Sequence, residues 1–373
     1  MTRCIITDAA VITALGNSLE ALWQGLMAGA TAIRPVHRFP VDSYPAKIAA
    51  CIDQLKPSDG RSMLDWLLNR LLAGTGPVPP DSLVITATTK AGIDNLELLR
   101  RGKPADFRDV LPYSITETVS RKLGLSAGGI NINAACASST IAVAHGAALI
   151  ASGRAESVLI CCGDLVTEFV FAGFSALKAL SAVPCRPFDR NRQGLSLGEG
   201  VAALHLMNAE RAAREKRRRL GTVLGWGVAN DASHITAPAR SGRGLIQAIE
   251  QALKTAGRKA EEIAVVNAHG TGTVYNDLME LTAFRKVFGD RTVPLYSVKG
   301  AIGHTLGAAG GIEVALGLKT LAAQTAPPTV GLKDPMDEAR LLVSAEPQPF
   351  SGGCLLTTNS GFGGINAALI LGN

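Results

Sequence analysis

The chain has 373 residues, of which 47% are hydrophobic and 18% charged, so it holds enough apolar material for a large buried core. Its formal net charge is +6, but no DNA- or RNA-binding motif accompanies the basic run Arg214–Arg219, so we interpret that run as a solvated helix end and expect no nucleic-acid partner. No apolar stretch of about 18 residues is free of polar interruptions, and Asp8 follows Met1 too closely for a signal peptide, so we expect a cytoplasmic protein without a membrane span.

The predicted elements alternate along the chain between short apolar runs and helices. Short apolar runs bounded by glycine, proline or asparagine are typical of fully buried strands. Two helices rich in small residues are predicted at Thr140–Ala151 and Gly307–Leu321. The alternation indicates an α/β protein. The predicted strands are Ser82–Ala87, Ile130–Ala134, Ser157–Cys162, Ile263–Asn267, Leu295–Val298 and Cys354–Asn359.

One pattern occurs twice in this order of elements. The strand Ile130–Ala134 leads to Cys136 and a helix, and the strand Leu295–Val298 leads to His304 and a helix. Two fused copies of one α/β unit, with a site between them, would explain this repetition. We therefore expect one half at residues 1–220 that carries a nucleophilic cysteine and a second half at residues 221–373 that carries two histidines.

Cys136 is the candidate nucleophile among seven cysteines, whose odd number argues against a disulfide framework. It lies in the segment NINAACASST, directly after a predicted strand and at a predicted helix start. The partial positive charge of a helix N-terminus favours a thiolate, and thiolates attack thioesters. Position alone leaves a buried, inert cysteine open as the alternative.

Two histidines share a setting that the other four lack. His269 lies in NAHGTGT and His304 in SVKGAIGHTLGAAGG, each after a predicted strand among glycines and hydroxyl side chains. Lys299 stands five residues before the second histidine. Glycines at such positions let backbone and substrate approach closely. The remaining histidines are expected to be structural or at the surface: His37, His145, His205 and His234.

At these residues the sequence resembles the β-ketoacyl-acyl-carrier-protein synthases, in particular the elongating condensing enzymes with a Cys-His-His site. The resemblance runs nearly from end to end and follows the family's order of blocks. The blocks are ITDAAVITALGNSLEALWQGLMAGATAI, AACASST, CRPFDRNRQGLSLGEGVAALHL, NAHGTGTVYND, SVKGAIGHTLGAAGGIE and TTNSGFGGINAALIL.

The resemblance implies a thiolase fold, in which two related halves form a layered α/β/α/β/α arrangement. It also implies that Cys136 receives the acyl chain, while His269 and His304 assist decarboxylation of malonyl thioester and hold the enolate. By the same resemblance Lys299 supports the site and Phe362 gates the acyl pocket. The other implied residues are Glu313 and Asp277, which order the site, and Thr236, Thr271 and Thr273, which line the pantetheine tunnel.

By the same resemblance, the backbone N–H groups of Cys136 and Phe362 would form the oxyanion hole for acyl transfer. Two neutral imidazoles would hold the negative charge of the enolate. No cofactor and no metal are implied, because the substrates travel on the phosphopantetheine arm of acyl carrier protein. That carrier is the expected partner, with Arg186 and Arg190 as its candidate docking residues. A homodimer is implied, and a heterodimer with another ketosynthase-like subunit stays open.

Three alternative functions stay open at this point. A degradative thiolase needs a second reactive cysteine in a C-terminal glycine-rich loop, but Cys354 lies before that loop. A priming synthase pairs its cysteine with histidine and asparagine, which His304 disfavours. A non-catalytic, chain-length-determining partner subunit usually lacks the nucleophile that Cys136 supplies.

The chain departs from the family pattern at three places. The segment between Cys51 and Ser82 is shorter than in typical members, and the C-terminal loop reads NSGFGG, where many members have an additional phenylalanine after NS. Val274-Tyr275 replaces a commoner proline-containing pair. These departures favour a specialised polyketide or polyene pathway nearly as readily as fatty-acid elongation.

Overall fold

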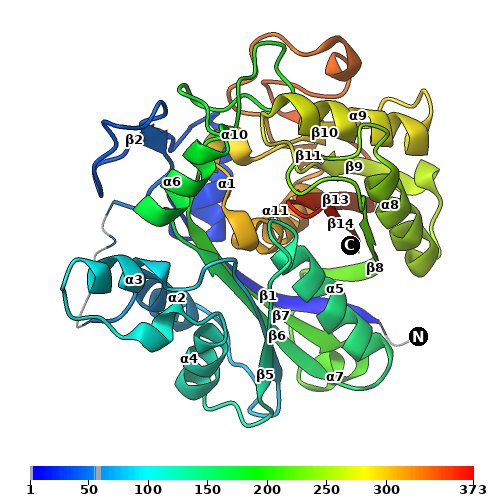
Figure 1. Ribbon diagram of the computed structural model, residues 1–373. Coiled ribbons are helices and arrows are strands. Elements are labelled where there is room, and N and C mark those ends of the chain that lie inside the picture. The colour runs from blue at the N-terminus through cyan, green and yellow to red at the C-terminus, as the bar shows by residue number, and fades with distance from the viewer. Residues whose placement is uncertain (1–2, 54, 56–59) are drawn as a thin grey trace.

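The computed structural model describes residues 3–53, 55 and 60–373, and its main feature is one large mixed sheet (Figure 1). The strand order in this sheet is β10-β9-β13-β14-β8-β1-β7-β6-β4-β5. The strands of one end are β1 (Cys4–Thr13), β4 (Leu83–Ala87), β5 (Gly129–Ile132), β6 (Ser157–Asp164) and β7 (Gly200–Asn208). Those of the other end are β8 (Gly221–Asn230), β9 (Ile263–Asn267), β10 (Leu295–Tyr296), β13 (Cys354–Gly361) and β14 (Ile365–Gly372).

The two ends of the sheet repeat one topology. Read outward from the middle, the order β1-β7-β6-β4-β5 matches β8-β14-β13-β9-β10 strand for strand along the chain. The pairings match as well, since the two inner pairs are antiparallel and the two outer pairs parallel at both ends. Only a short ladder, Cys4–Ile6 against 221–223, joins β1 to β8. This repetition supports the division into halves at residues 1–220 and 221–373, which we keep as a proposal.

Two helices lie at the centre, α5 (Ser138–Ala151) and α11 (Ala309–Ala323). They contact each other, and each packs against strands of both ends of the sheet. The outer faces are covered by α2 (Met63–Ala73) and α4 (Ser114–Leu123) at one end and by α8 (Arg243–Ala256) and α9 (Val274–Phe288) at the other (Figure 1). Helix, sheet, helix, sheet and helix therefore succeed one another, as expected for a thiolase fold.

The remaining elements are short. The helices are α1 (Leu19–Met27), α3 (Ile93–Arg100), α6 (Glu168–Ala176), α7 (Ala209–Arg214) and α10 (Lys299–Ile302), with 3-10 turns η1 (Phe107–Val110), η2 (Ala260–Glu262), η3 (Leu306–Ala308) and η4 (Asp337–Ala339). Two small ribbons pair β2 (Arg34–Pro35) with β3 (Ile48–Ala49) and β11 (Thr325–Ala326) with β12 (Gln348–Pro349).

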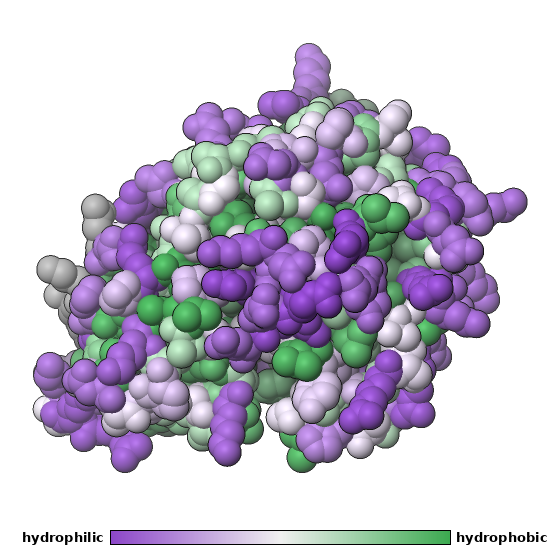
Figure 2. Space-filling model, turned by 90° about the horizontal axis from the view of Figure 1, so that it is seen from above, coloured by the Kyte–Doolittle hydropathy of each residue, from purple (hydrophilic) through white to green (hydrophobic). Residues whose placement is uncertain are grey.

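The helical segment Leu306–Ala323 is long and apolar enough to cross a membrane by length and composition. However, 83% of it is buried inside the protein, where it forms part of the central layer. Burial in a core explains its apolar character. Seen from above, the surface is largely hydrophilic, with hydrophobic residues in small, separate patches (Figure 2).

All six predicted strands are present, but two end early. β5 ends at Ile132 and β10 at Tyr296, two residues before the predicted ends, because the chain leaves the sheet there toward Cys136 and His304. Both predicted central helices are also present. Four antiparallel strands of the sheet were not predicted: β1, β7, β8 and β14. Three of them, β7, β8 and β14, are rich in alanine and glycine, which have weak strand propensity.

Candidate active site

Cys136, His269 and His304 converge in the protein interior. Their exposed fractions are 7%, 2% and 1%, and their ligand-type atoms all lie within 4.8 Å of one another. Cys136 precedes α5, His269 follows β9, and His304 lies between α10 and η3. The two imidazole rings meet edge to face, with centroids 5.1 Å apart. The structure thus brings together the three residues that the sequence singled out.

A tight turn presents the thiol of Cys136. Ala135 has a φ of +49°, which is unusual for a residue other than glycine and marks a constrained bend. Ser138 fixes this bend, since its hydroxyl accepts from the N–H of Ala134 (2.8 Å) and donates to the carbonyl of Ala135 (2.6 Å). The bend therefore holds Cys136 at the start of α5, as predicted.

The thiol is nevertheless not the ready thiolate that its helix position suggested. Burial raises the pKa of Cys136 to about 11, which outweighs the lowering effects of the Lys299 charge and of a backbone hydrogen bond from Phe362. The prediction of a thiolate favoured by the helix start is wrong for the resting site. At neutral pH the group is a thiol, whose proton must leave during acyl transfer.

Asn359 fixes the orientation and tautomer of His269. Its amide nitrogen has two hydrogens, directed at Oε2 of Glu313 (2.8 Å) and Nδ1 of His269 (3.1 Å), while its oxygen accepts from the hydroxyl of Thr140. Nδ1 must therefore accept, so the proton sits on Nε2 and His269 is a hydrogen-bond donor on its free side. Asn359 was not predicted as a site residue, because asparagine near a glycine-rich loop is commonplace.

Lys299 and Glu313 form a buried ion pair. The ammonium Nζ lies 2.6 Å from Oε1 of Glu313, and both side chains are 1% exposed. Burial, followed by the Lys299 charge, lowers the pKa of His304 and of His269 well below the usual value, so both imidazoles are neutral. Within the described residues neither ring nitrogen of His304 has a hydrogen-bond partner, which leaves it free to bind a substrate oxygen.

Two carboxylates of α9 hold the loop after His269. Glu280 accepts the backbone N–H groups of His269 and Gly270, both at 2.7 Å. Asp277 accepts those of Thr271 (3.1 Å) and Gly272 (3.2 Å). Burial, with the nearby charge of Asp277, raises the pKa of Glu280 to about 8, while the hydrogen bonds from Gly270 and His269 favour its charged form. The resemblance pointed to Asp277, whereas Glu280 was missed.

Asp164 plays the corresponding part beside His304. Its fully buried carboxylate accepts from the hydroxyl of Thr88 (2.8 Å), the hydroxyl of Thr89 (2.8 Å) and the backbone N–H of Gly307 (2.7 Å). An added Cβ at Gly307 would lie 2.7 Å from Oδ2 of Asp164 and 3.1 Å from the backbone N of Thr89, so glycine suits this close approach. Asp164 therefore ties the His304 segment to the segment that follows β4. It was not predicted, since an acid at a strand end has many ordinary roles.

A cavity of about 350 Å³ leads from the surface to the three residues. Phe362 lies in its wall and stacks on Phe174 of α6, with ring centroids 5.8 Å apart. Three predicted tunnel residues also line the cavity: Thr236, Thr271 and Thr273. Lys299 does not line it, so this lysine acts on the site through its charge and its pairing.

Comparison of the sequence with models of known protein families shows whether this arrangement of catalytic side chains belongs to one of them. Residues 88–212 match the β-ketoacyl synthase N-terminal domain, and residues 220–333 match the β-ketoacyl synthase C-terminal domain. The chain belongs to the β-ketoacyl synthase family. It is therefore a condensing enzyme of the acyltransferase type.

Individual β-ketoacyl synthases resemble it over their whole length. The 3-oxoacyl-[acyl-carrier-protein] synthase 2 of Rhizobium meliloti is 32% identical, over 100% of this chain and 99% of that protein. The structure of the ishigamide ketosynthase/chain length factor is 30% identical, with a TM-score of 0.91, over 100% of this chain and 99% of the other. A ketosynthase in complex with its chain length factor from Xenorhabdus doucetiae is 28% identical, with a TM-score of 0.84, over 100% and 98%. These neighbours confirm the thiolase-type fold.

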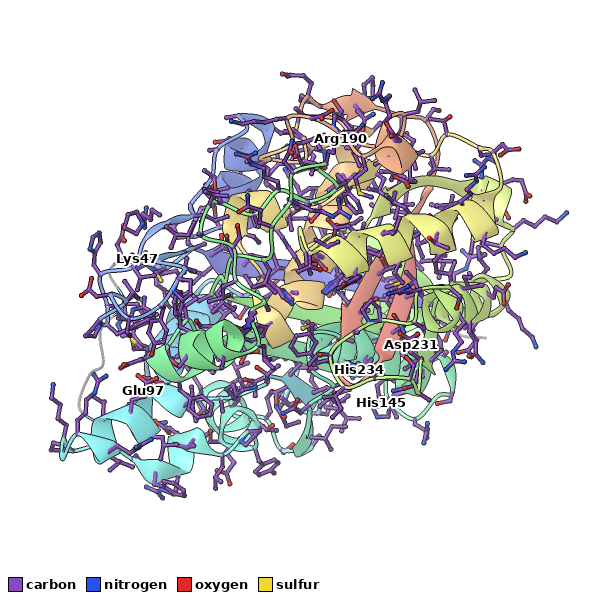
Figure 3. The ribbon with its side chains drawn as sticks, turned by 45° about the horizontal axis from the view of Figure 1, so that its top comes forward. Lys47, Glu97, His145, Arg190, Asp231 and His234 are labelled. Carbon is purple, nitrogen blue, oxygen red and sulfur yellow. The ribbon has the colours of Figure 1, made fainter. Side chains whose placement is uncertain are left out.

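The histidines His205 and His234 lie outside the group of Cys136, His269 and His304 and have structural contacts. His205 is buried and bonded to the hydroxyl of Ser157 (2.8 Å). His234 is exposed, and its Nδ1 accepts the backbone N–H groups of Thr236 (3.1 Å) and Ala237 (3.0 Å), which shapes the loop that carries Thr236. Figure 3 shows His234 with Asp231 on one side of α9 and Arg190 on the other.

Cysteine and two histidines are also ligand types that zinc binds. The ammonium of Lys299, which lowers the pKa of both imidazoles, would repel a cation at this point. The arrangement is better suited to an anion that develops on a substrate oxygen, as condensation by a β-ketoacyl synthase requires.

Proposed function

We propose that the chain catalyses a decarboxylative Claisen condensation between an acyl group held on Cys136 and a malonyl group carried by acyl carrier protein. The convergence of Cys136, His269 and His304 in one buried cavity carries this proposal. The names of its relatives agree, since they include 3-oxoacyl-[acyl-carrier-protein] synthases.

In the first half-reaction Cys136 exchanges one thioester for another. Its sulfur bonds to the acyl carbon, the bond from that carbon to the pantetheine sulfur breaks, and the thiol proton goes to the departing thiolate. Because burial raises the pKa of Cys136 to about 11, this proton leaves as the new bond forms. The backbone N–H groups of Cys136 and Phe362 are assigned to hold the tetrahedral oxyanion.

In the second half-reaction malonyl thioester loses CO₂ and its electron pair moves into an enolate. Nε2–H of His269 and a ring N–H of the unpartnered His304 are assigned to the enolate oxygen. The carbanion carbon then attacks the acyl carbon, and the bond from that carbon to Cys136 Sγ breaks. The released thiolate takes up one proton from solvent, which balances the negative charge of the malonyl carboxylate that left as CO₂. Burial, assisted by the Lys299 charge, keeps both imidazoles neutral, so they act as hydrogen-bond donors rather than as acids.

The substrates are assigned to phosphopantetheine arms rather than to a dissociable cofactor. Thr236, Thr271 and Thr273 line the cavity between the surface and the histidines, where such an arm would lie. The hydroxyls of Thr271 and Thr273 are 2.9 Å apart, so they present a polar patch that suits the amides of the arm. A carrier-dependent enzyme of this kind is expected in the cytoplasm.

A second candidate function is that of a chain-length-determining subunit. Structures of ketosynthases with chain length factors are among those that this chain resembles. The complete trio with its Lys299–Glu313 pair favours the catalytic role, because a subunit that only shapes a pocket has no need of a buried charge beside a nucleophile.

Incubation with acyl carrier protein substrates tests the proposal. Intact mass spectrometry should show an acyl mass on the wild-type chain and none on Cys136→Ala, and malonyl carrier should then give a β-ketoacyl product. Cys185→Ala is the matched control, because burial raises the pKa of that thiol to about 11 as well, yet Cys185 lies outside the cavity. Acylation of another cysteine would refute the assignment of Cys136.

A further inference from the structure

Large apolar side chains surround the mouth of the cavity that leads to Cys136. Three of them line the cavity itself, and two extend its rim outward. Ile235 belongs to this rim because its carbonyl accepts the N–H of Gly363, next to Phe362 (2.6 Å). We call the five side chains the apolar collar. They are, with their exposed fractions, Leu177 (53%), Ile235 (77%), Val274 (51%), Tyr275 (61%) and Leu278 (41%).

The collar has a local structural origin in α9. Val274 and Tyr275 begin this helix, and Leu278 lies one turn further along the same side as Val274. Asp277 and Glu280, on the buried side, accept backbone groups of the loop after His269, so the helix start cannot rotate to hide its apolar residues. Apolar surface that stays exposed around a functional cavity is typical of a docking site.

Two arginines near this region, Arg190 and Arg192, already have partners. Arg190 contacts Asp334 (3.0 Å) and Asp337 (2.7 Å). Arg192 donates to the carbonyls of Thr273 (3.2 Å) and Val274 (2.8 Å). Neither guanidinium is therefore free to pair with an incoming carboxylate without losing its present partners.

Lys178 differs from these arginines. It lines the cavity, its residue is exposed, and it has no salt bridge within the described residues. Among the described residues that line the cavity, Lys178 is the one with a cationic side chain.

Resting on the proposed function, we infer that the carrier protein docks on the apolar collar through its own apolar side chains, with Lys178 as the principal ionic contact. A carrier whose arm passes through the mouth must sit on the rim of that mouth. The sequence favoured docking on Arg186 and Arg190. A carrier on Arg190 would lie on the other side of α9 from His234, next to acids that already neutralise this arginine (Figure 3).

The composition of the apolar collar predicts how carrier binding depends on salt concentration. Charge-driven docking weakens steeply with ionic strength because exposed pairs are screened over about 8–10 Å. Contact between apolar surfaces does not depend on such pairs. The KM for carrier-bound substrate is therefore expected to rise less than about threefold between low and physiological salt, as a single ion pair would allow.

The test compares self-acylation of the full chain by acyl carrier protein and by a short acyl-pantetheine thioester. The variants are Ile235→Ser with Leu278→Ser, the outer members of the collar, and the control is Leu341→Ser, which is 74% exposed and lies outside the cavity. We expect the double variant to raise the KM for the carrier substrate about tenfold. The KM for the short thioester and both values in the control should stay within about twofold.

Three results would overturn the inference. The double variant could leave the carrier KM unchanged while Arg186→Glu raises it, which would restore docking on the arginines. It could raise both KM values equally, which would place the effect in the cavity. If the wild-type chain acylates Cys136 with neither substrate, the proposed function itself fails, and this is distinguishable because the other two results require active wild-type enzyme.

Discussion

The protonation state of Cys136 results from burial that opposes nearby positive charge. Because its pKa is raised to about 11, the thiolate fraction should increase about tenfold per pH unit across the neutral and mildly alkaline range. Alkylation of Cys136 by iodoacetamide, followed by peptide mass mapping, should show this slope between about pH 7 and pH 10. A plateau below about pH 9 would contradict the dominance of burial. The thiol of Cys4, whose pKa burial raises further, should label more slowly throughout.

The two histidines should separate the half-reactions. His269→Ala and His304→Ala each remove one donor to the enolate oxygen, and loss of such a donor typically costs roughly 10²–10³ in rate. Both variants should still gain an acyl mass at Cys136 but lose most CO₂ release from malonyl carrier. Loss of acylation with retained decarboxylation would reverse the roles assigned here.

The free energy of unfolding should differ between His269→Ala and His304→Ala. His269→Ala leaves one hydrogen of the buried Asn359 amide without an acceptor, which costs about 1–3 kcal/mol, whereas the nitrogens of His304 have no partner to lose within the described residues. Urea unfolding should therefore show the larger loss from hydrogen bonding in His269→Ala. Equal losses would argue that Asn359 does not fix His269.

The Lys299–Glu313 pair should be more sensitive to the loss of one partner than of both. Lys299→Met or Glu313→Gln leaves one ionisable group alone in the interior, and breaking a buried pair typically costs about 3–5 kcal/mol. The double variant should recover part of that free energy of unfolding while it stays poor in decarboxylation. A double-variant cycle in urea measures the coupling, and strictly additive losses would contradict it.

At the scale of elements, α9 both positions the site and builds its rim. Glu280→Gln keeps the size of the side chain but sets amide hydrogens against the N–H groups of His269 and Gly270. The loop after β9 should shift, and condensation should fall at least about tenfold while acylation of Cys136 changes little. Thr282→Ala, an exposed position on the same helix, is the control. Unchanged condensation in Glu280→Gln would show that Asp277 alone is enough to hold the loop.

Elements and site residues could be predicted from the sequence where neighbouring residues in the chain form a recognisable pattern. Strands such as β9 stand out because a short apolar run ends at a glycine-rich segment, and His269 follows directly. Asn359 and Asp164 gain their roles from contacts with residues far along the chain, Thr140 and Gly307, so no local pattern could reveal them. Burial of Cys136 is likewise a property of the assembled fold, which is why its pKa was misjudged.

At the scale of the whole molecule, the two ends of the large sheet are protected differently. β10 is an edge strand whose residues Leu295 and Tyr296 are buried. β5 is the opposite edge, and its Ile130 is 45% exposed. Exposed apolar side chains also occur in the segment before α4: Phe107 (56%), Leu111 (51%) and Tyr113 (50%). An open strand edge beside apolar surface is a template for pairing with another chain.

The dimer expected from the sequence should therefore form along β5. Ile130→Lys places a charge on the open edge and should convert the dimer into a monomer, as measured by sedimentation velocity over a range of concentrations. Leu341→Lys, an equally drastic change at a position that is 74% exposed elsewhere, should stay dimeric. Co-expression with a ketosynthase-like partner would extend the test, because a chain built for a heterodimer should be monomeric alone and pair through the same edge only when that partner is present. A dimer that survives Ile130→Lys would place the interface on another face.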